Sequence, residues 1–429
     1  MKHAFWSILL LLSIFGETAL FTFGKNFAGS PMSPAIWLIS GMATAIAGFF
    51  LIGFKTSVVD QPLKKPVKWE SFLVFGIFIA GMVYCAVSLT SIFAKYPIDA
   101  SASDIVPSME LYARRFLAGE KVYTTLVFEH HNVDPTYFPL MWLPYIVPEI
   151  LNMDYRWAPF GLFMIVLYFY YWQLSLSPVH WLEKVFKACV PFFILSRCFM
   201  FAESMFGYAV ELVPVAYYMI LTGSLSAKNR WFTGLGILVC LLSRYAFTFW
   251  LPVYFILILA TEGWKSVFRM SAVAVAGVLL LYILPFLMKD PAIFTKGLAY
   301  YDKTAVGQWQ IQGWQSPGDK PYHLTHGLSF SEWIYDHVGG DMLNKLSTAK
   351  KIHLIACFFS AVLILLVFMF YRNKSLDINC YALVALKFYL TVFYGFWYVP
   401  FPYLYTLPLF ISIPILFKTK IFTNFAYQN

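Results

Sequence analysis

Long apolar segments recur along almost the whole chain, and they limit its possible folds more than any other feature. An α-helix needs about 20 apolar residues to cross the hydrocarbon core of a membrane. Hydrophobic residues make up 60% of the 429 residues and charged residues only 12%, against roughly a quarter charged in soluble domains. The sequence therefore predicts an all-α, polytopic membrane protein, a single transmembrane domain of residues 1–429 with about 12 transmembrane helices. The expected spans are 4–23, 32–54, 72–94, 157–176, 188–204, 207–224, 232–243, 247–260, 270–288, 351–371, 380–397 and 401–417.

Lysine and arginine residues indicate how this predicted bundle is oriented. Short cytoplasmic loops of membrane proteins are rich in Lys and Arg. With twelve spans, all the basic clusters of the short loops fall on one side, among them the loop 55–71 with Lys55, Lys64, Lys65 and Lys68. We therefore expect both termini inside and two long polar loops, 95–152 and 289–350, outside. The apolar stretch 138–152 is interrupted by three prolines and is predicted to be interfacial or re-entrant.

The remaining composition argues against several classes of function. The formal charge of +9 is explained by topology and by attraction to anionic lipid, since no soluble basic module for nucleic acid is present. The six cysteines show no zinc spacing, and no metal or cofactor is predicted. His130 and His131 with Asp134 leave a metal site open as an alternative to a simple turn before Pro135.

The first outer loop contains the acids and bases of a candidate active site. Its residues 105–118 have a helical pattern, with an apolar face suited to the membrane surface. Asp99 or Asp104 would lie near the headgroup plane, where a carboxylate can take a proton from a hydroxyl. The alternative for Asp104 is a helix N-cap. The basic side chains that follow can hold a phosphate or simply face solvent and lipid headgroups: Arg114, Arg115 and Lys121.

Two stretches resemble the bacterial GT-C glycosyltransferases, and most of all the polyprenyl-phosphate-mannose-dependent mannosyltransferases. The first runs in the order Asp104, Tyr112-Ala113, Gly119, Tyr123, Tyr137-Phe138-Pro139-Leu140 and Leu143-Pro144. The second contains Gly207, Glu211-Leu212, Ser243-Arg244-Tyr245 and Trp250-Leu251-Pro252. The resemblance covers roughly 95–290. The chain departs from the family pattern at Phe138, where a proline is usual, at Arg244, where a lysine is usual, and in having two spans before the acidic loop.

This resemblance implies a GT-C-like fold and the inverting transfer of a hexose, such as mannose, from a polyprenyl-phosphate donor. Asp104 would be the general base, with Asp99 as its substitute, and Arg244 would bind the phosphate. The alternative for Arg244 is an ion pair with Glu203 or Glu211. His131 and Tyr137 are expected near the substrate. The acceptor would be a glycolipid, a glycan or a protein, and the membrane the bacterial inner membrane with the active face outward.

The second outer loop is a candidate acceptor-binding loop. It is rich in aromatic residues, including Trp309 and Trp314. Aromatic faces stack on sugar rings, although they also anchor loops at the headgroup level.

A transporter or flippase of lipid-linked glycans is the competing hypothesis. It draws on the charged residues within apolar sequence, Glu17, Glu203, Arg244 and Lys387. The enzyme hypothesis requires an outer acid and a cation at one cavity that is open to lipid, whereas a transporter requires a charged path to both faces.

Overall fold

The computed structural model describes residues 2–54, 68–129, 131–227, 229–316 and 318–422. Within these ranges the fold is almost entirely helical, as predicted, and the strands are one short antiparallel pair, β1 (Leu126–Val127) and β2 (Asn132–Val133). Lys55, Lys64 and Lys65 of the predicted cytoplasmic loop lie outside the described residues, and so does His130.

Among the described residues, seven helices are long and apolar enough to cross a membrane, judged by length and composition. Each coincides with a predicted span, which confirms the membrane character of the chain. They are α1 (Lys2–Phe23), α2 (Met32–Ile52), α3 (Lys68–Lys95), α7 (Trp157–Leu176), α13 (Trp264–Val278) with its π-helical continuation η4 (Leu279–Leu287), α17 (Met342–Tyr371) and α18 (Ile378–Gly395).

The other five predicted spans are also helical, but a full crossing by them stays a prediction. They form α8 (Trp181–Phe201), α10 (Leu212–Leu225), α11 (Arg230–Leu241), α12 (Trp250–Glu262) and α19 (Thr406–Lys418). At about 1.5 Å per residue, the 14 residues of α10 extend only about 21 Å, and α11 and α12 are shorter still. The hydrocarbon core is about 30 Å thick, so these three helices are each too short to cross it alone.

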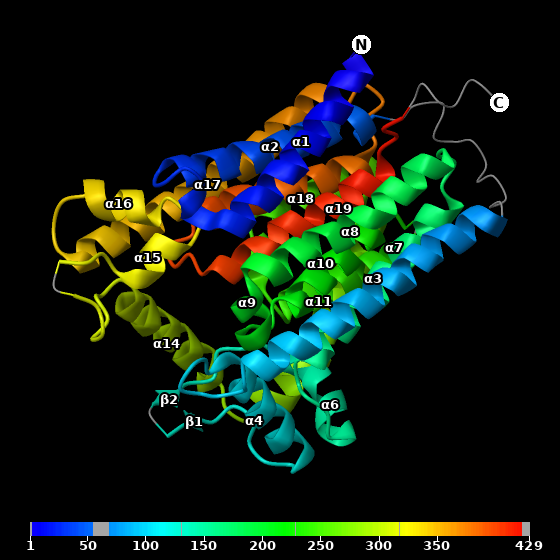
Figure 1. Ribbon diagram of the computed structural model, residues 1–429. Coiled ribbons are helices and arrows are strands. Elements are labelled where there is room, and N and C mark those ends of the chain that lie inside the picture. Colours follow the sequence, from blue (N-terminus) through cyan, green and yellow to red (C-terminus); the bar gives the residue numbers. More distant parts are fainter. Residues whose placement is uncertain (1, 55–67, 130, 228, 317, 423–429) are drawn as a thin grey trace.

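The two long polar loops lie at the same end of the bundle, away from the start of α1 (Figure 1). The first contributes α4 (Ile105–Leu117), α5 (Pro139–Trp142), η2 (Leu143–Tyr145) and α6 (Ile146–Leu151). The second contributes α14 (Ala292–Gln308), α15 (Tyr322–His326) and α16 (Ser331–His337). The proline-interrupted stretch is thus a chain of short helices. It is bonded to the bundle core through the carbonyl of Leu140, which accepts from Tyr217, and the amide of Leu140, which donates to Leu242.

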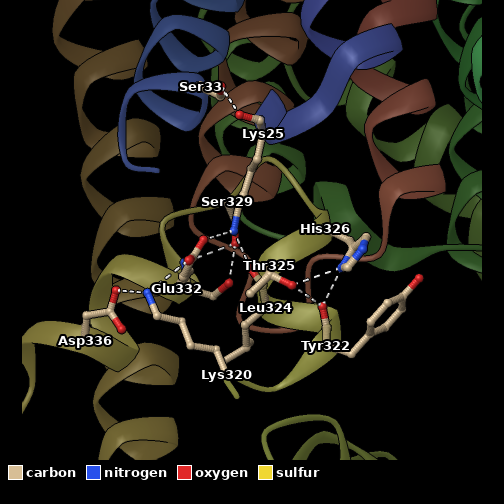
Figure 2. Close-up of polar contacts among 11 residues, drawn as sticks. Lys25, Ser33, Lys320, Tyr322, Leu324, Thr325, His326, Ser329, Glu332 and Asp336 are labelled. Atoms are coloured by element: carbon tan, nitrogen blue, oxygen red, sulfur yellow. Dashed lines mark hydrogen bonds and ion pairs between the residues drawn. The ribbon is translucent and has the colours of Figure 1, made fainter. Parts of the chain in front are cut away.

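A partly buried ionic cluster near the surface fastens the second outer loop to the turn η1 (Gly24–Phe27) after α1. Figure 2 shows the Lys25 ammonium pointing to Glu332, at 2.5 Å, and to the carbonyl of Leu324. Lys320 lies 3.2 Å from Glu332 and 2.6 Å from Asp336. Burial by itself raises the pKa of Glu332, but Lys25 and Lys320 hold that pKa below its ordinary value.

A second ionic cluster lies inside the bundle, between α1 and α18. Glu17 and Lys387 form an ion pair, and both side chains are 0% exposed. The second carboxylate oxygen of Glu17 accepts a hydrogen bond from Thr44 at 2.6 Å, and Lys387 also donates to the carbonyl of Pro408 at 2.7 Å. Each charged group therefore has partners on more than one helix, which compensates its burial in a low-dielectric interior.

Candidate active site

A cavity of about 270 Å³ lies beneath the two outer loops. Segments distant in sequence line it: the loop before α5, the end of α11, η3 (Tyr245–Phe247), η4 and α14. The lining residues are Tyr123, Pro135, Thr136, Tyr137, Phe138, Leu241, Tyr245, Tyr282, Ile293, Phe294, Gly297, Leu298 and Tyr301. Phe294 and Leu298 are also 46% and 48% exposed, so apolar side chains form part of its rim. Such a rim suits the hydrocarbon of a lipid.

Aromatic rings build the wall of this cavity. The Phe138 ring lies 5.4 Å from the Tyr282 ring and 6.0 Å from the Tyr245 ring, both edge-on. Tyr123 also meets Tyr282, at 6.1 Å. Tyr282 comes from η4, where the wider π-helical turn contains Pro285, and π-helical turns are frequent at functional sites. The tyrosines give an otherwise apolar cavity a set of neutral hydroxyl groups.

Arg244 does not line the cavity itself, but lies in the extended link between α11 and η3. Its Nη2 is 2.6 Å from Oε1 of Glu211, so the predicted alternative of a Glu211 ion pair is found. Glu203 pairs with Lys95 instead. Arg244 is next to Tyr245, which lines the cavity, and its charge also acts on Tyr137 and Tyr301. The guanidinium is therefore a cation close to residues of the cavity wall, and Glu211 already partly neutralises it.

Asp104 lies in the first outer loop and does not itself line the cavity. It occupies the N-cap position of α4, but its side chain makes no capping hydrogen bond. Instead, its Oδ2 lies 3.5 Å from Nε2 of His131, with the two side chains 36% and 41% exposed. Burial raises the pKa of Tyr137, the charge of Asp104 raises it further, and Arg244 opposes both effects. Tyr137 thus lies within electrostatic range of both the acid and the cation.

The other predicted site residues of the first outer loop lie elsewhere. The Asp99 carboxylate accepts hydrogen bonds from the amide and hydroxyl of Ser101, at 2.8 and 2.6 Å, in an exposed turn. Arg115 donates to the carbonyls of Thr124 and Thr125, at 2.9 and 3.2 Å, and so holds the loop after α4. Arg114 pairs with Glu110 at 2.7 Å and with Glu149 at 3.4 Å. The side chain of Lys121 is exposed. None of these four residues lines the cavity.

The predicted aromatic platform of the second outer loop is only partly open. Trp309 is 1% exposed, and its indole N–H donates to the carbonyl of Tyr398 at 2.7 Å. It therefore packs inside the loop and offers no free face to a sugar, contrary to the prediction. Trp314 is 69% exposed and meets Tyr322 edge-on at 5.1 Å, so its ring stays available.

Sequence analysis did not assign Tyr245 or Tyr282 to the site. Both lie in apolar segments where a tyrosine is usually a packing residue, and no local pattern separates a packing tyrosine from a cavity-lining one.

For metal binding, the described part of the chain holds no group of three or more His, Cys, Asp or Glu side chains that could bind an ion.

Comparison with known proteins adds no family to this geometry. No protein-family model, curated protein or solved structure matches the chain. The likeness to GT-C glycosyltransferases therefore depends on the residues quoted above, and the activity it implies is a proposal.

Proposed function

We propose that the protein is a membrane glycosyltransferase that moves a hexose, such as mannose, from a polyprenyl-phosphate donor to an acceptor hydroxyl at the outer face of a bacterial inner membrane. The observation that supports this most strongly is Tyr137, which lines the cavity and feels the charges of both Asp104 and Arg244. We infer that a carboxylate and a cation, neither of which lines the cavity, act on it through Tyr137, beside an apolar rim. These are the three elements that a lipid-linked phosphate donor requires.

Each group has a defined part in the proposed reaction. The lipid tail lies along the rim at Phe294 and Leu298, and the Arg244 guanidinium binds the phosphate. Asp104 takes the proton of the acceptor hydroxyl, whose oxygen attacks the anomeric carbon from the side opposite the phosphate. The bond between the anomeric carbon and the phosphate oxygen breaks, and the polyprenyl phosphate leaves with the bonding electron pair. The configuration at the anomeric carbon inverts, and Arg244 stabilises the charge of the leaving group.

The most direct test is transfer of labelled mannose from polyprenyl-phosphate mannose by the purified protein, with membrane extract as acceptor. Asp104→Asn keeps the shape of the side chain but removes the base, so the rate is expected to fall about 100- to 10,000-fold. Glu120→Gln is the matched control, because Glu120 is an exposed acid of the same loop that does not line the cavity. Transfer by Asp104→Asn at the rate of the control would remove Asp104 as the base.

The competing function, transport of a lipid-linked glycan, needs a charged path that reaches both faces. Glu17 and Lys387 do not supply one, because they are fully buried and bonded to each other, to Thr44 and to Pro408. Arg244 and Glu211 remain compatible with it. Movement of labelled lipid across a vesicle membrane, without a new glycosidic bond in the product, would favour transport over transfer.

A further inference from the structure

Glu211 and Arg244 form an ion pair that is not fully matched. The contact joins Oε1 of Glu211 to Nη2 of Arg244, and the arginine side chain is 23% exposed whereas the glutamate is 5% exposed. Oε2 of Glu211 is buried and has no hydrogen-bond partner among the described residues. A buried carboxylate oxygen normally makes a hydrogen bond, so this oxygen needs an explanation.

A second, small cavity next to Glu211 can hold a hydrogen-bond partner for its Oε2 atom. It has a volume of about 20 Å³ and is lined by Glu211, Arg156 and Thr406 together with apolar side chains. This is enough room for one water molecule. Arg156 is itself held by Asp154 and by the carbonyl of Phe93, at 2.6 and 3.2 Å, so its charge is fixed in place. Glu211 thus lies between two cations: Arg244, with which it pairs, and Arg156, which lines the same small cavity.

We propose that Glu211 is a built-in competitor of the lipid phosphate for Arg244, and that it weakens product binding so that the spent lipid phosphate can leave. This inference deepens the proposed function and depends on it for the nature of the anion. In the empty site, Glu211 holds the guanidinium. When a phosphate binds, Arg244 turns to it, and the charge of Arg156 and a water molecule in the small cavity then stabilise the Glu211 carboxylate. Glu211 is accordingly a positioning residue and not a catalytic one.

The physical basis is the charge balance at a site with low exposure. A carboxylate next to the only charged ligand assigned to the phosphate repels the phosphate and also occupies its partner. Removing that negative charge must strengthen anion binding, whereas loss of a merely structural residue would weaken it. The sign of the change therefore separates the two roles.

The experiment measures equilibrium binding of radiolabelled farnesyl phosphate to the purified full-length protein in detergent micelles. Glu211→Gln keeps the side-chain shape and removes the charge, so the affinity is expected to rise about tenfold or more. Glu203→Gln is the matched control, because Glu203 pairs with Lys95, and its affinity should equal that of the wild type. Glu211→Ala removes the same charge and replaces the glutamine variant should that variant not fold.

A second arm asks whether the effect passes through Arg244. Arg244→Gln should lose most of the affinity, and adding Glu211→Gln to it should then change nothing. Unchanged or weaker binding by Glu211→Gln, or tighter binding that persists without Arg244, would overturn the inference. Transfer activity is a separate readout: these affinity changes without any sugar transfer would refute the proposed transferase alone, and transfer with no affinity change would refute only the role of Glu211.

Discussion

Two of the buried ion pairs among the described residues, Glu17–Lys387 and Glu211–Arg244, differ in how completely their charges are matched. The first is fully buried, and each member has further partners on neighbouring helices. The second has an arginine that is 23% exposed, next to the cavity-lining Tyr245, and a glutamate with one unmatched oxygen. Both are charges within apolar sequence, but Glu211 of the second pair lines a small cavity.

The difference shows that a charge at membrane depth does not by itself indicate a site. A closed pair such as Glu17–Lys387 joins helices and has no capacity left for a ligand. An incompletely matched pair beside a cavity has a donor that can change partner. The comparison therefore favours a structural role for Lys387 and supports the proposed binding role of Arg244.

Breaking the closed pair should have the largest effect on stability. Lys387→Met leaves the Glu17 charge buried without its cation, which is expected to cost about 3–5 kcal/mol of unfolding free energy. The double variant with Glu17→Gln should recover most of that loss, because no buried charge remains. Denaturant unfolding in bicelles or detergent would measure the unfolding free energy of both variants. A loss below about 1 kcal/mol for Lys387→Met would show that the buried pair is not needed to compensate the Glu17 charge.

Breaking the open pair should affect activity more than stability. Arg244→Gln is expected to lower sugar transfer about 100- to 1,000-fold, as for removal of a donor that stabilises developing charge. Its stability loss should be smaller than that of Lys387→Met, because water can reach the partly exposed site. Turnover and unfolding measured on the same preparation would test this, and a large stability loss with unchanged turnover per folded molecule would reverse the two assignments.

The surface cluster around Lys25 gives an intermediate case that responds to pH. The pKa of Glu332 is lowered below its ordinary value of 4.5, so its contribution to stability is present above that value and disappears as the pH falls through the lowered one. We expect a fall of a few degrees in the melting temperature, or lower hydrogen-exchange protection factors in α15 and α16, on acidification below about pH 4.5. Glu332→Gln should remove this component of the pH dependence, and an unaltered pH profile in that variant would contradict it.

The smallest effect is expected at Trp314, which is largely exposed. Trp314→Ala should change stability by no more than about 0.5 kcal/mol, as is usual for exposed positions. If its ring stacks on the acceptor, KM for the acceptor should rise while farnesyl phosphate affinity stays constant. An unchanged KM would leave Trp314 as a headgroup anchor only.

Several features of this protein followed from the sequence alone. Apolar length determined the helices, because backbone groups in lipid must be bonded within the segment. The seven candidate membrane-spanning helices coincide with predicted spans, and the proline-interrupted stretch 138–152 forms three short helices. The position of both polar loops at one end also agrees with the charge pattern (Figure 1).

Other features depended on the tertiary structure, because they arise between segments far apart in the chain. Periodicity cannot show that Arg244 pairs with Glu211 and not with Glu203, since both acids lie in apolar sequence. It cannot show that Asp104 is free of its capping role and faces His131. Nor does composition distinguish a buried Trp309 from an exposed Trp314. Packing decides which side chains meet and which keep an open face, and so it decides which charges remain available for a ligand.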